Sequence, residues 1–161
     1  MGKTFVEVIK IFFGLSKEII NNVELKGREY FEEAKAKGKG ILFITGHCGN
    51  WKLMAIVFSL KIEPTSVVAR PLDNPYMNKI LENVRRRFGN RVIYKKGALK
   101  NIISTLRKNG SVGILMDQAV VSDEGYVVEF LGRGAWTTKM PALIAIKDRG
   151  GCVTNFYKQV N

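Results

Sequence analysis

The stretch GILFITGHCGNW, residues 40–51, contains the first clear strand of the chain and the residues that end it. Residues 41–45 form a short β-branched and aromatic run without polar alternation, which is typical of a strand covered on both faces. Gly46 and His47 follow this run, and residues 50–59 have the composition of a helix. The stretch therefore predicts a strand, a turn that carries the only histidine of the chain, and a helix in direct succession.

Strand and helix patterns alternate along the rest of the chain. Asn74 and Pro75 provide a helix N-cap and a first helical residue, and Gly38 is suited to end a helix. This alternation predicts an α/β fold with a mixed, largely parallel sheet flanked by helices, in which ligands bind beyond the carboxyl ends of the strands. The predicted strands are 41–45, 64–70, 91–94, 111–116 and 126–130, and the predicted helices are 4–14, 28–37, 50–59, 75–88, 99–106 and 140–147.

Length and composition favour a single domain over residues 1–161, because 161 residues with 46% apolar content are enough for one core. The last residues, 156–161, resemble the start of another strand, so we expect the domain to be incomplete at its C-terminus. Cys48 and Cys152 are far apart and form no CxxC pair, which argues against a disulfide framework or a zinc site. No metal or cofactor is expected.

The chain is strongly basic, with 26 Lys and Arg against 14 Asp and Glu. Residues 79–108 contain ten basic side chains and one acid, Glu82. Such a segment is either a solvated face or a surface for an acidic or phosphate-rich partner, such as nucleic acid, anionic lipid or an acidic carrier protein. No helix-turn-helix, RNP or zinc-finger pattern accompanies it, so nucleic acid is not the expected partner, although a basic nucleic-acid-binding module remains an alternative.

The string TGHCGNW, residues 45–51, resembles the active-site block of the bacterial lipid A biosynthesis (lauroyl/myristoyl) acyltransferases, which belong to the HX4D/E type of acyltransferases. In this motif a histidine is followed after four residues by Asp or Glu. The resemblance covers nearly the whole chain in the family's order. It continues through residues 70–75, 96–99, 113–118, 130–133, 137–138 and 141–143.

The resemblance implies transfer of a fatty acyl chain from acyl carrier protein or coenzyme A to a hydroxyl of a lipid A precursor or related glycolipid. It places the protein at the cytoplasmic face of the bacterial inner membrane, on an anionic lipid surface. His47 would be the general base, which suits an imidazole at neutral pH, and Arg70 would contact phosphate. The other substrate-binding residues that the resemblance implies are Asn50, Asp117, Gln118 and Arg133.

One position departs from the motif. Lys52 stands where the family has Asp or Glu, and a lysine cannot accept the imidazole N–H. Loss of the analogous aspartate in a catalytic triad costs about 10⁴ in rate. The sequence therefore predicts that His47 lacks its acidic partner and that the chain is inactive or severely impaired, as a lipid-binding or carrier-binding fragment would be. The alternative is that a carboxylate from elsewhere reaches His47, with Glu63, Asp73 and Asp117 as the candidates.

Overall fold

The computed structural model describes residues 10, 20–21, 23–47, 50–95, 97–147 and 153–155, the last of these as backbone only. The predicted helix at 4–14 falls outside these residues except for Lys10, and so do both cysteines and the segment 156–161. The remaining predicted elements can be compared with the structure.

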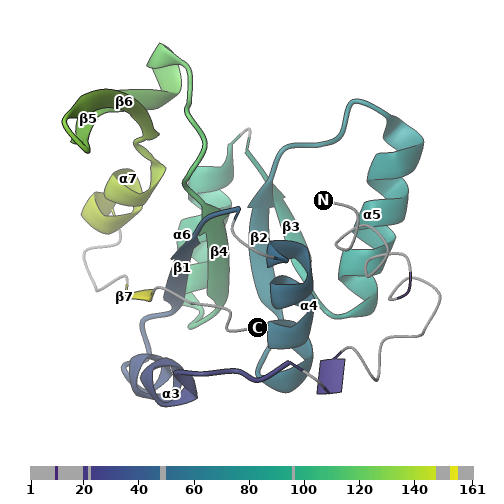
Figure 1. Cartoon of the computed structure of the whole chain (residues 1–161). Coiled ribbons are helices and arrows are strands. Elements are labelled where there is room, and N and C mark those ends of the chain that lie inside the picture. The colour runs from purple at the N-terminus through teal and green to yellow at the C-terminus, as the bar shows by residue number, and fades with distance from the viewer. Residues whose placement is uncertain are drawn as a thin grey trace.

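The central feature is a sheet in which every recorded strand pair is parallel (Figure 1). Its strand order is β3-β2-β4-β1-β7, so β1 and β4 are neighbours although five other elements separate them in the chain. The strands are β1 (Ile41–Thr45), β2 (Thr65–Ala69), β3 (Arg91–Tyr94), β4 (Ser111–Leu115) and β7 (Val153–Asn155). The predicted α/β class and the first four strand positions are confirmed.

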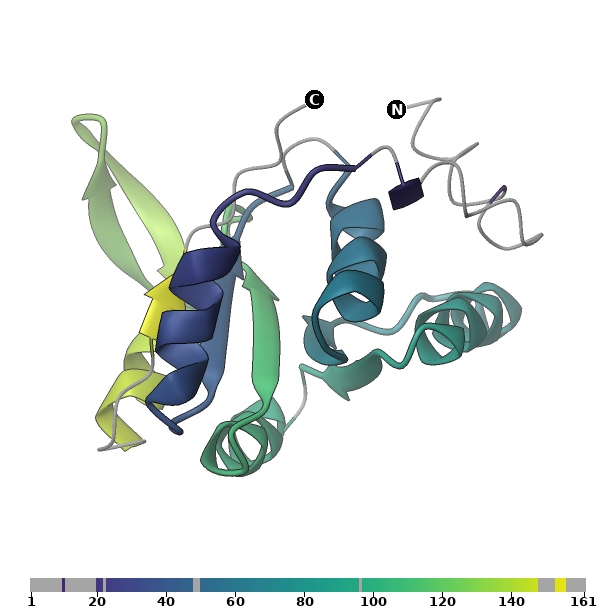
Figure 2. The same cartoon turned by 90° about the horizontal axis from the view of Figure 1, so that it is seen from below.

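Helices connect the strands and cover both faces of the sheet, and Figure 2 shows α4 and α6 on opposite sides. The helices are α3 (Arg28–Ala36), α4 (Trp51–Lys61), α5 (Pro75–Arg87), α6 (Ala98–Arg107) and α7 (Met140–Lys147). The predicted cap of α5 is confirmed, because the Asn74 side chain accepts hydrogen bonds from the N–H groups of Tyr76 at 2.9 Å and Met77 at 3.2 Å.

The alternation of side chains along β1 distributes them between two apolar layers. Phe43 faces α3 and α4, where its ring lies 4.9 Å from that of Phe58, centroid to centroid. Leu42 faces the other side and packs with Ile102 of α6 and Ile144 of α7. Burial of each such side chain contributes roughly 1.5–3 kcal/mol. Both faces of β1 are therefore covered, as its unbroken apolar run predicts.

Strands β5 (Gly125–Phe130) and β6 (Arg133–Thr138) form a separate antiparallel hairpin that follows the short 3₁₀ helix η1 (Ser122–Glu124). The sequence predicted β5 but not β6, because the RGAWTT segment has no apolar alternation and contains a glycine. The two-residue turn consists of Leu131 and Gly132, which both have positive φ, at 53° and 76°. Such a turn matches the twist of a hairpin.

Buried polar side chains hold together the amino edge of the sheet, where the strands begin. Asn90 is 2% exposed; it accepts from the Thr65 N–H and donates to the Ala55 carbonyl, both at 3.0 Å. Lys35 forms an ion pair with Glu63 at 2.8 Å in a half-buried position. These contacts fix the loops that precede the strands.

Candidate active site

Parallel pairing places the ends of β1, β4 and β2 side by side at the carboxyl edge of the sheet. His47 follows β1, Asp117 follows β4 and Arg70 directly follows β2. The register pairs Thr45 with Leu115, so the residues two positions beyond each strand end are also neighbours. Two of the predicted site residues, His47 and Asp117, therefore meet although 70 positions separate them.

Asp117 binds His47 through both carboxylate oxygens. Its Oδ1 lies 2.7 Å from the ring Nδ1, and its Oδ2 accepts the His47 backbone N–H at 2.5 Å. The side chains are 30% exposed for His47 and 41% exposed for Asp117, so the pair is open to an incoming substrate. This geometry fixes both the backbone and the ring of the histidine.

Gly46 makes room for this contact. A Cβ atom at position 46 would lie 3.0 Å from Asp117 Oδ2 and 3.1 Å from its Cγ, which is closer than ordinary van der Waals contact. The Met116 N–H donates to the Thr45 carbonyl at 2.9 Å and continues the β1–β4 pairing up to this point. The glycine of the TGH string therefore allows the carboxylate to approach the main chain.

The pairing determines which ring nitrogen can act as a base. A carboxylate only accepts hydrogen bonds, so the ring hydrogen lies on Nδ1 and Nε2 keeps its lone pair. Partial desolvation raises the pKa of Asp117, but the hydrogen bonds from the His47 ring and backbone outweigh this and lower the pKa overall. Asp117 is therefore ionised at neutral pH and can accept the hydrogen bond from the His47 ring.

Lys52 contacts Trp51, its neighbour on the first turn of α4. Its Nζ lies 5.3 Å from the centroid of the Trp51 ring, and the indole in turn meets the His47 ring edge to face at 4.9 Å between centroids. This contact between Trp51 and His47 was not predicted from the sequence. The prediction that His47 lacks an acidic partner is wrong, because Asp117 provides a carboxylate from a different strand.

The other two candidate carboxylates have different partners. Glu63 lies at the amino edge, paired with Lys35 and accepting from the Ser111 hydroxyl. Asp73 is exposed, and its Oδ1 lies 3.4 Å from Nη2 of Arg70. Among the three candidates, Asp117 is the one that the structure places against the histidine.

The remaining predicted site residues have different placements. Asn50 is buried, and its side chain caps α4 by accepting the Leu53 N–H at 3.1 Å. Arg70 is largely exposed at the end of β2, and Gln118 is exposed next to Asp117. Arg133 opens β6 and pairs with Phe130 across the hairpin turn. Contact of these residues with substrate stays a prediction.

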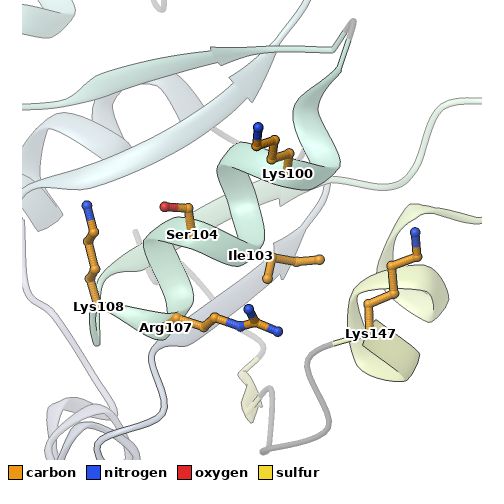
Figure 3. A pocket seen from close by; sticks show the side chains of 6 residues that line it. All are labelled: Lys100, Ile103, Ser104, Arg107, Lys108 and Lys147. Atoms are coloured by element: carbon orange, nitrogen blue, oxygen red, sulfur yellow. The ribbon is translucent and has the colours of Figure 1, made fainter.

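The side chains of the basic segment, residues 79–108, differ in how deeply they are buried. Arg85 is half-buried, and desolvation lowers its pKa although Glu82 opposes this. A shallow groove of about 530 Å³ lies between α6 and α7, and the basic segment 79–108 provides most of its lining. Figure 3 shows the side chains that line it. Its lining residues are Lys100, Ile103, Ser104, Arg107, Lys108 and Lys147. The groove does not include His47 or Asp117.

Two features are absent from the part of the chain that the structure describes. Within it, no group of three or more His, Cys, Asp or Glu side chains could hold a metal ion. In the same residues, no helix is both long and apolar enough to cross a membrane.

Comparison of the sequence with known proteins identifies its family. The profile described as "Bacterial lipid A biosynthesis acyltransferase" matches residues 1–157. A relative from Haemophilus influenzae, named "Lipid A biosynthesis acyltransferase", is 27% identical over 141 residues, covering 82% of this chain and 44% of the relative. The chain therefore spans less than half the length of that relative. Since the family profile covers almost the whole sequence, the chain belongs to the bacterial lipid A biosynthesis acyltransferase family.

Proposed function

We propose that this chain transfers a fatty acyl group from the thioester of acyl carrier protein, or of coenzyme A, to a hydroxyl of a lipid A precursor or related glycolipid. The observation that carries the proposal is the His47–Asp117 pair, with its 2.7 Å contact between Nδ1 and Oδ1. The Haemophilus influenzae relative is named for lipid A biosynthesis, which supports a glycolipid acceptor. The reaction would take place at the cytoplasmic face of the inner membrane, where such an acceptor is available.

The pair supports one sequence of steps. The Nε2 atom of His47 removes the proton from the acceptor hydroxyl while the oxygen attacks the thioester carbonyl. Asp117 stabilises the imidazolium that forms, as the aspartate of a serine hydrolase triad does. The tetrahedral intermediate then collapses, the carbon–sulfur bond breaks, and His47 returns the proton to the leaving thiolate. An ester and a free thiol are the products, so atoms and charge balance.

Asp117 replaces the motif acid in this proposal. A carboxylate at position 52 would approach the ring from the first turn of α4, whereas Asp117 approaches from the end of β4. Either approach supplies an acceptor to one ring nitrogen, which is what orientation of the base requires. The Lys52 ammonium lies over the Trp51 ring, a favourable place for a cation. We therefore propose that the chain is an active enzyme, whereas Lys52 considered alone predicts an impaired one.

The donor and acceptor sites follow from charge. An acidic carrier protein is attracted to a chain with a net charge of +12, and Arg70 at the end of β2 is suited to a glycolipid phosphate. Arg70 is exposed and its partner Asp73 lies 3.4 Å away, so a phosphate could replace that weak surface pairing.

The test is transfer of a radiolabelled acyl chain from acyl carrier protein, and separately from coenzyme A, to a lipid A precursor. We expect activity in the unmodified chain, its loss in His47→Ala, and a decrease of about 10⁴ in Asp117→Asn. Asp73→Asn is the matched control, because it removes an exposed carboxylate at the same edge and should retain most of the rate.

Three results would contradict the proposal. Asp117→Asn with the same rate as Asp73→Asn would show that the carboxylate does not assist the base. A folded unmodified chain that binds the carrier or the lipid without transfer would favour the inactive binding fragment instead. Tight, salt-sensitive binding to nucleic acid with no transfer would favour the basic nucleic-acid-binding module.

A further inference from the structure

The β5–β6 hairpin exposes apolar side chains on both of its faces and at its turn. Val127 is 57% exposed and Phe130 is 65% exposed, while Leu131 in the turn is 88% exposed. Val127 and Phe130 are separated by an odd number of positions on one strand, so their side chains lie on opposite faces. A two-stranded hairpin is only marginally stable in water, and exposed apolar groups on both faces add no stability. These side chains are therefore suited to contact with a partner.

The turn itself is unfavourable for the residue it contains. Leu131 has φ 53° and Gly132 has φ 76°, the combination of a two-residue type I′ turn. Asn-Gly is the preferred pair at these positions, because asparagine tolerates positive φ much better than leucine does. The exposed leucine is thus unfavourable in both its backbone conformation and its solvation.

A second exposed apolar segment lies on the other side of the same edge. Leu72 and Met77 are 46% and 47% exposed, and Tyr76 is 80% exposed. These residues follow the carboxyl end of β2 and begin α5. Figure 1 shows the start of α5 and the hairpin on opposite sides of the upper end of the sheet. This is the carboxyl edge, at which His47 follows β1. Exposed apolar groups therefore flank the His47–Asp117 pair on two sides.

We propose that these six residues form an apolar rim that inserts into the headgroup region of an anionic lipid surface and holds His47 close to it. The proposal rests on the proposed function for the lipid acceptor that His47 would meet there. A lipid surface surrounds an inserted hairpin, whereas a protein partner typically covers one face, so exposure on both faces and at the tip favours lipid. The six residues of the apolar rim are Leu72, Tyr76, Met77, Val127, Phe130 and Leu131.

Charged side chains near the rim are consistent with insertion to a shallow depth. Arg133 pairs with Phe130 at the turn, and Arg70 lies two positions before Leu72, so both cations are close to apolar tips. Guanidinium groups bind lipid phosphates well. Glu129 and Asp73 are also exposed at this edge, and their carboxylates restrict the rim to the headgroup layer.

The test measures partitioning of the chain into vesicles of phosphatidylcholine with and without one quarter phosphatidylglycerol, by flotation. Leu131→Asn creates the preferred Asn-Gly turn, so its melting temperature should equal or exceed that of the unmodified chain. Its partition coefficient should nevertheless fall about tenfold, because one large apolar side chain no longer enters the lipid. Tyr76→Gln should weaken partitioning from the other side of the rim.

Leu60→Gln is the matched control. Leu60 is 48% exposed on the last turn of α4, at the amino edge of the sheet, and its replacement should leave partitioning unchanged. Equal partitioning of Leu131→Asn and the unmodified chain would overturn the proposal. So would a chain that does not bind the vesicles, or a Leu131→Asn variant that loses only self-association, measured by sedimentation without lipid.

The test is independent of acyl transfer. His47→Ala should bind vesicles as well as the unmodified chain does, since the ring is not part of the rim. If vesicle binding depends on the rim but neither the unmodified chain nor any variant transfers acyl groups, the proposed function alone would be refuted. If the chain transfers acyl groups but Leu131→Asn leaves its partitioning into vesicles unchanged, the apolar rim alone would be refuted.

Discussion

The two edges of the sheet use their polar side chains differently. At the amino edge, Asn90 is 2% exposed, and its side-chain amide forms hydrogen bonds with two backbone groups of neighbouring segments. At the carboxyl edge, the Asp117 side chain is 41% exposed and binds one residue, His47. The first arrangement stabilises the fold, and the second leaves Nε2 of the ring available for chemistry.

Glycines show the same difference between the edges. A Cβ at Gly40, which has φ 72°, would lie 2.4 Å from the Leu106 carbonyl oxygen, so the amino edge requires glycine for backbone packing. A Cβ at Gly46 would instead lie 3.0 Å from a side-chain oxygen of Asp117. Changes at the amino edge should therefore reduce stability, and changes at the carboxyl edge should reduce activity.

The largest expected effect is at the carboxyl edge. In the proposed mechanism His47 and Asp117 act as one unit, so the double variant His47→Ala, Asp117→Asn should lose no more activity than His47→Ala alone, a decrease of about 10⁴ or more. Rate constants for acyl transfer from the four combinations test this. Losses that multiply would mean that Asp117 acts separately from the histidine.

Asn90→Ala should have the largest effect on stability. It leaves the buried Thr65 N–H without its partner and removes the hydrogen bond to the Ala55 carbonyl, which costs about 1–3 kcal/mol. The free energy of unfolding in urea measures this. At a temperature where the variant is folded, its acyl-transfer rate should match that of the unmodified chain, and a rate defect in the folded variant would contradict the division between the edges.

Gly46→Ala should have an effect of intermediate size, and it should lower the acyl-transfer rate more than the stability of the fold. The added methyl group displaces the Asp117 carboxylate, and a misplacement of about 1 Å costs on the order of 10² in rate. The acyl-transfer rate and the melting temperature should be measured together. If the variant instead unfolds with little change in the rate of its folded fraction, Gly46 serves packing only.

Lys52→Glu should change the rate by less than about tenfold, because Asp117 already binds Nδ1 and the lysine side chain contacts Trp51. The comparison of Lys52→Glu with the unmodified chain at pH 7 measures this directly. A gain of several orders of magnitude would restore the interpretation in which Lys52 impairs the enzyme.

The smallest effect is on the pH dependence of stability. Asp117 has a lowered pKa in the folded chain, so its pairing stabilises the fold above the ordinary carboxyl pKa of 3.8 and is lost as the pH falls through the lowered value. The contribution is below about 1 kcal/mol because the pair is exposed. The difference in unfolding free energy between the unmodified chain and Asp117→Asn should therefore shrink below about pH 4, and a constant difference would contradict the pairing.

Much of the fold could be predicted from the sequence, because local signals define its elements. The apolar run at 41–45 and the Asn74-Pro75 pair predict β1 and the start of α5 correctly. The β6 strand could not be predicted, since its residues are mostly small or polar and its pairing depends on β5. Local pattern also gives no information about strand order, which places β4 beside β1.

The candidate site was predictable in its histidine and not in its carboxylate. The resemblance identifies His47 by its motif and names Asp117 as a residue of the same family pattern. It assigns the acid to position 52, where this chain has Lys52. The contact between His47 and Asp117 depends on the alignment of Thr45 with Leu115, a long-range property of the sheet. Once that alignment is known, the contact follows from counting two residues along each strand.

The β1–β4 register also has a consequence for how the protein folds. During synthesis, His47 is made 70 residues before the carboxylate that orients it, and the intervening segment must supply two strands and three helices before β4 can dock. Closing such a long loop is entropically costly, and parallel pairing of distant strands is slow. A nascent or partly folded chain therefore contains the histidine without its orienting group. Acyl-transfer competence should then appear only late in refolding, with the completion of the β1–β4 ladder.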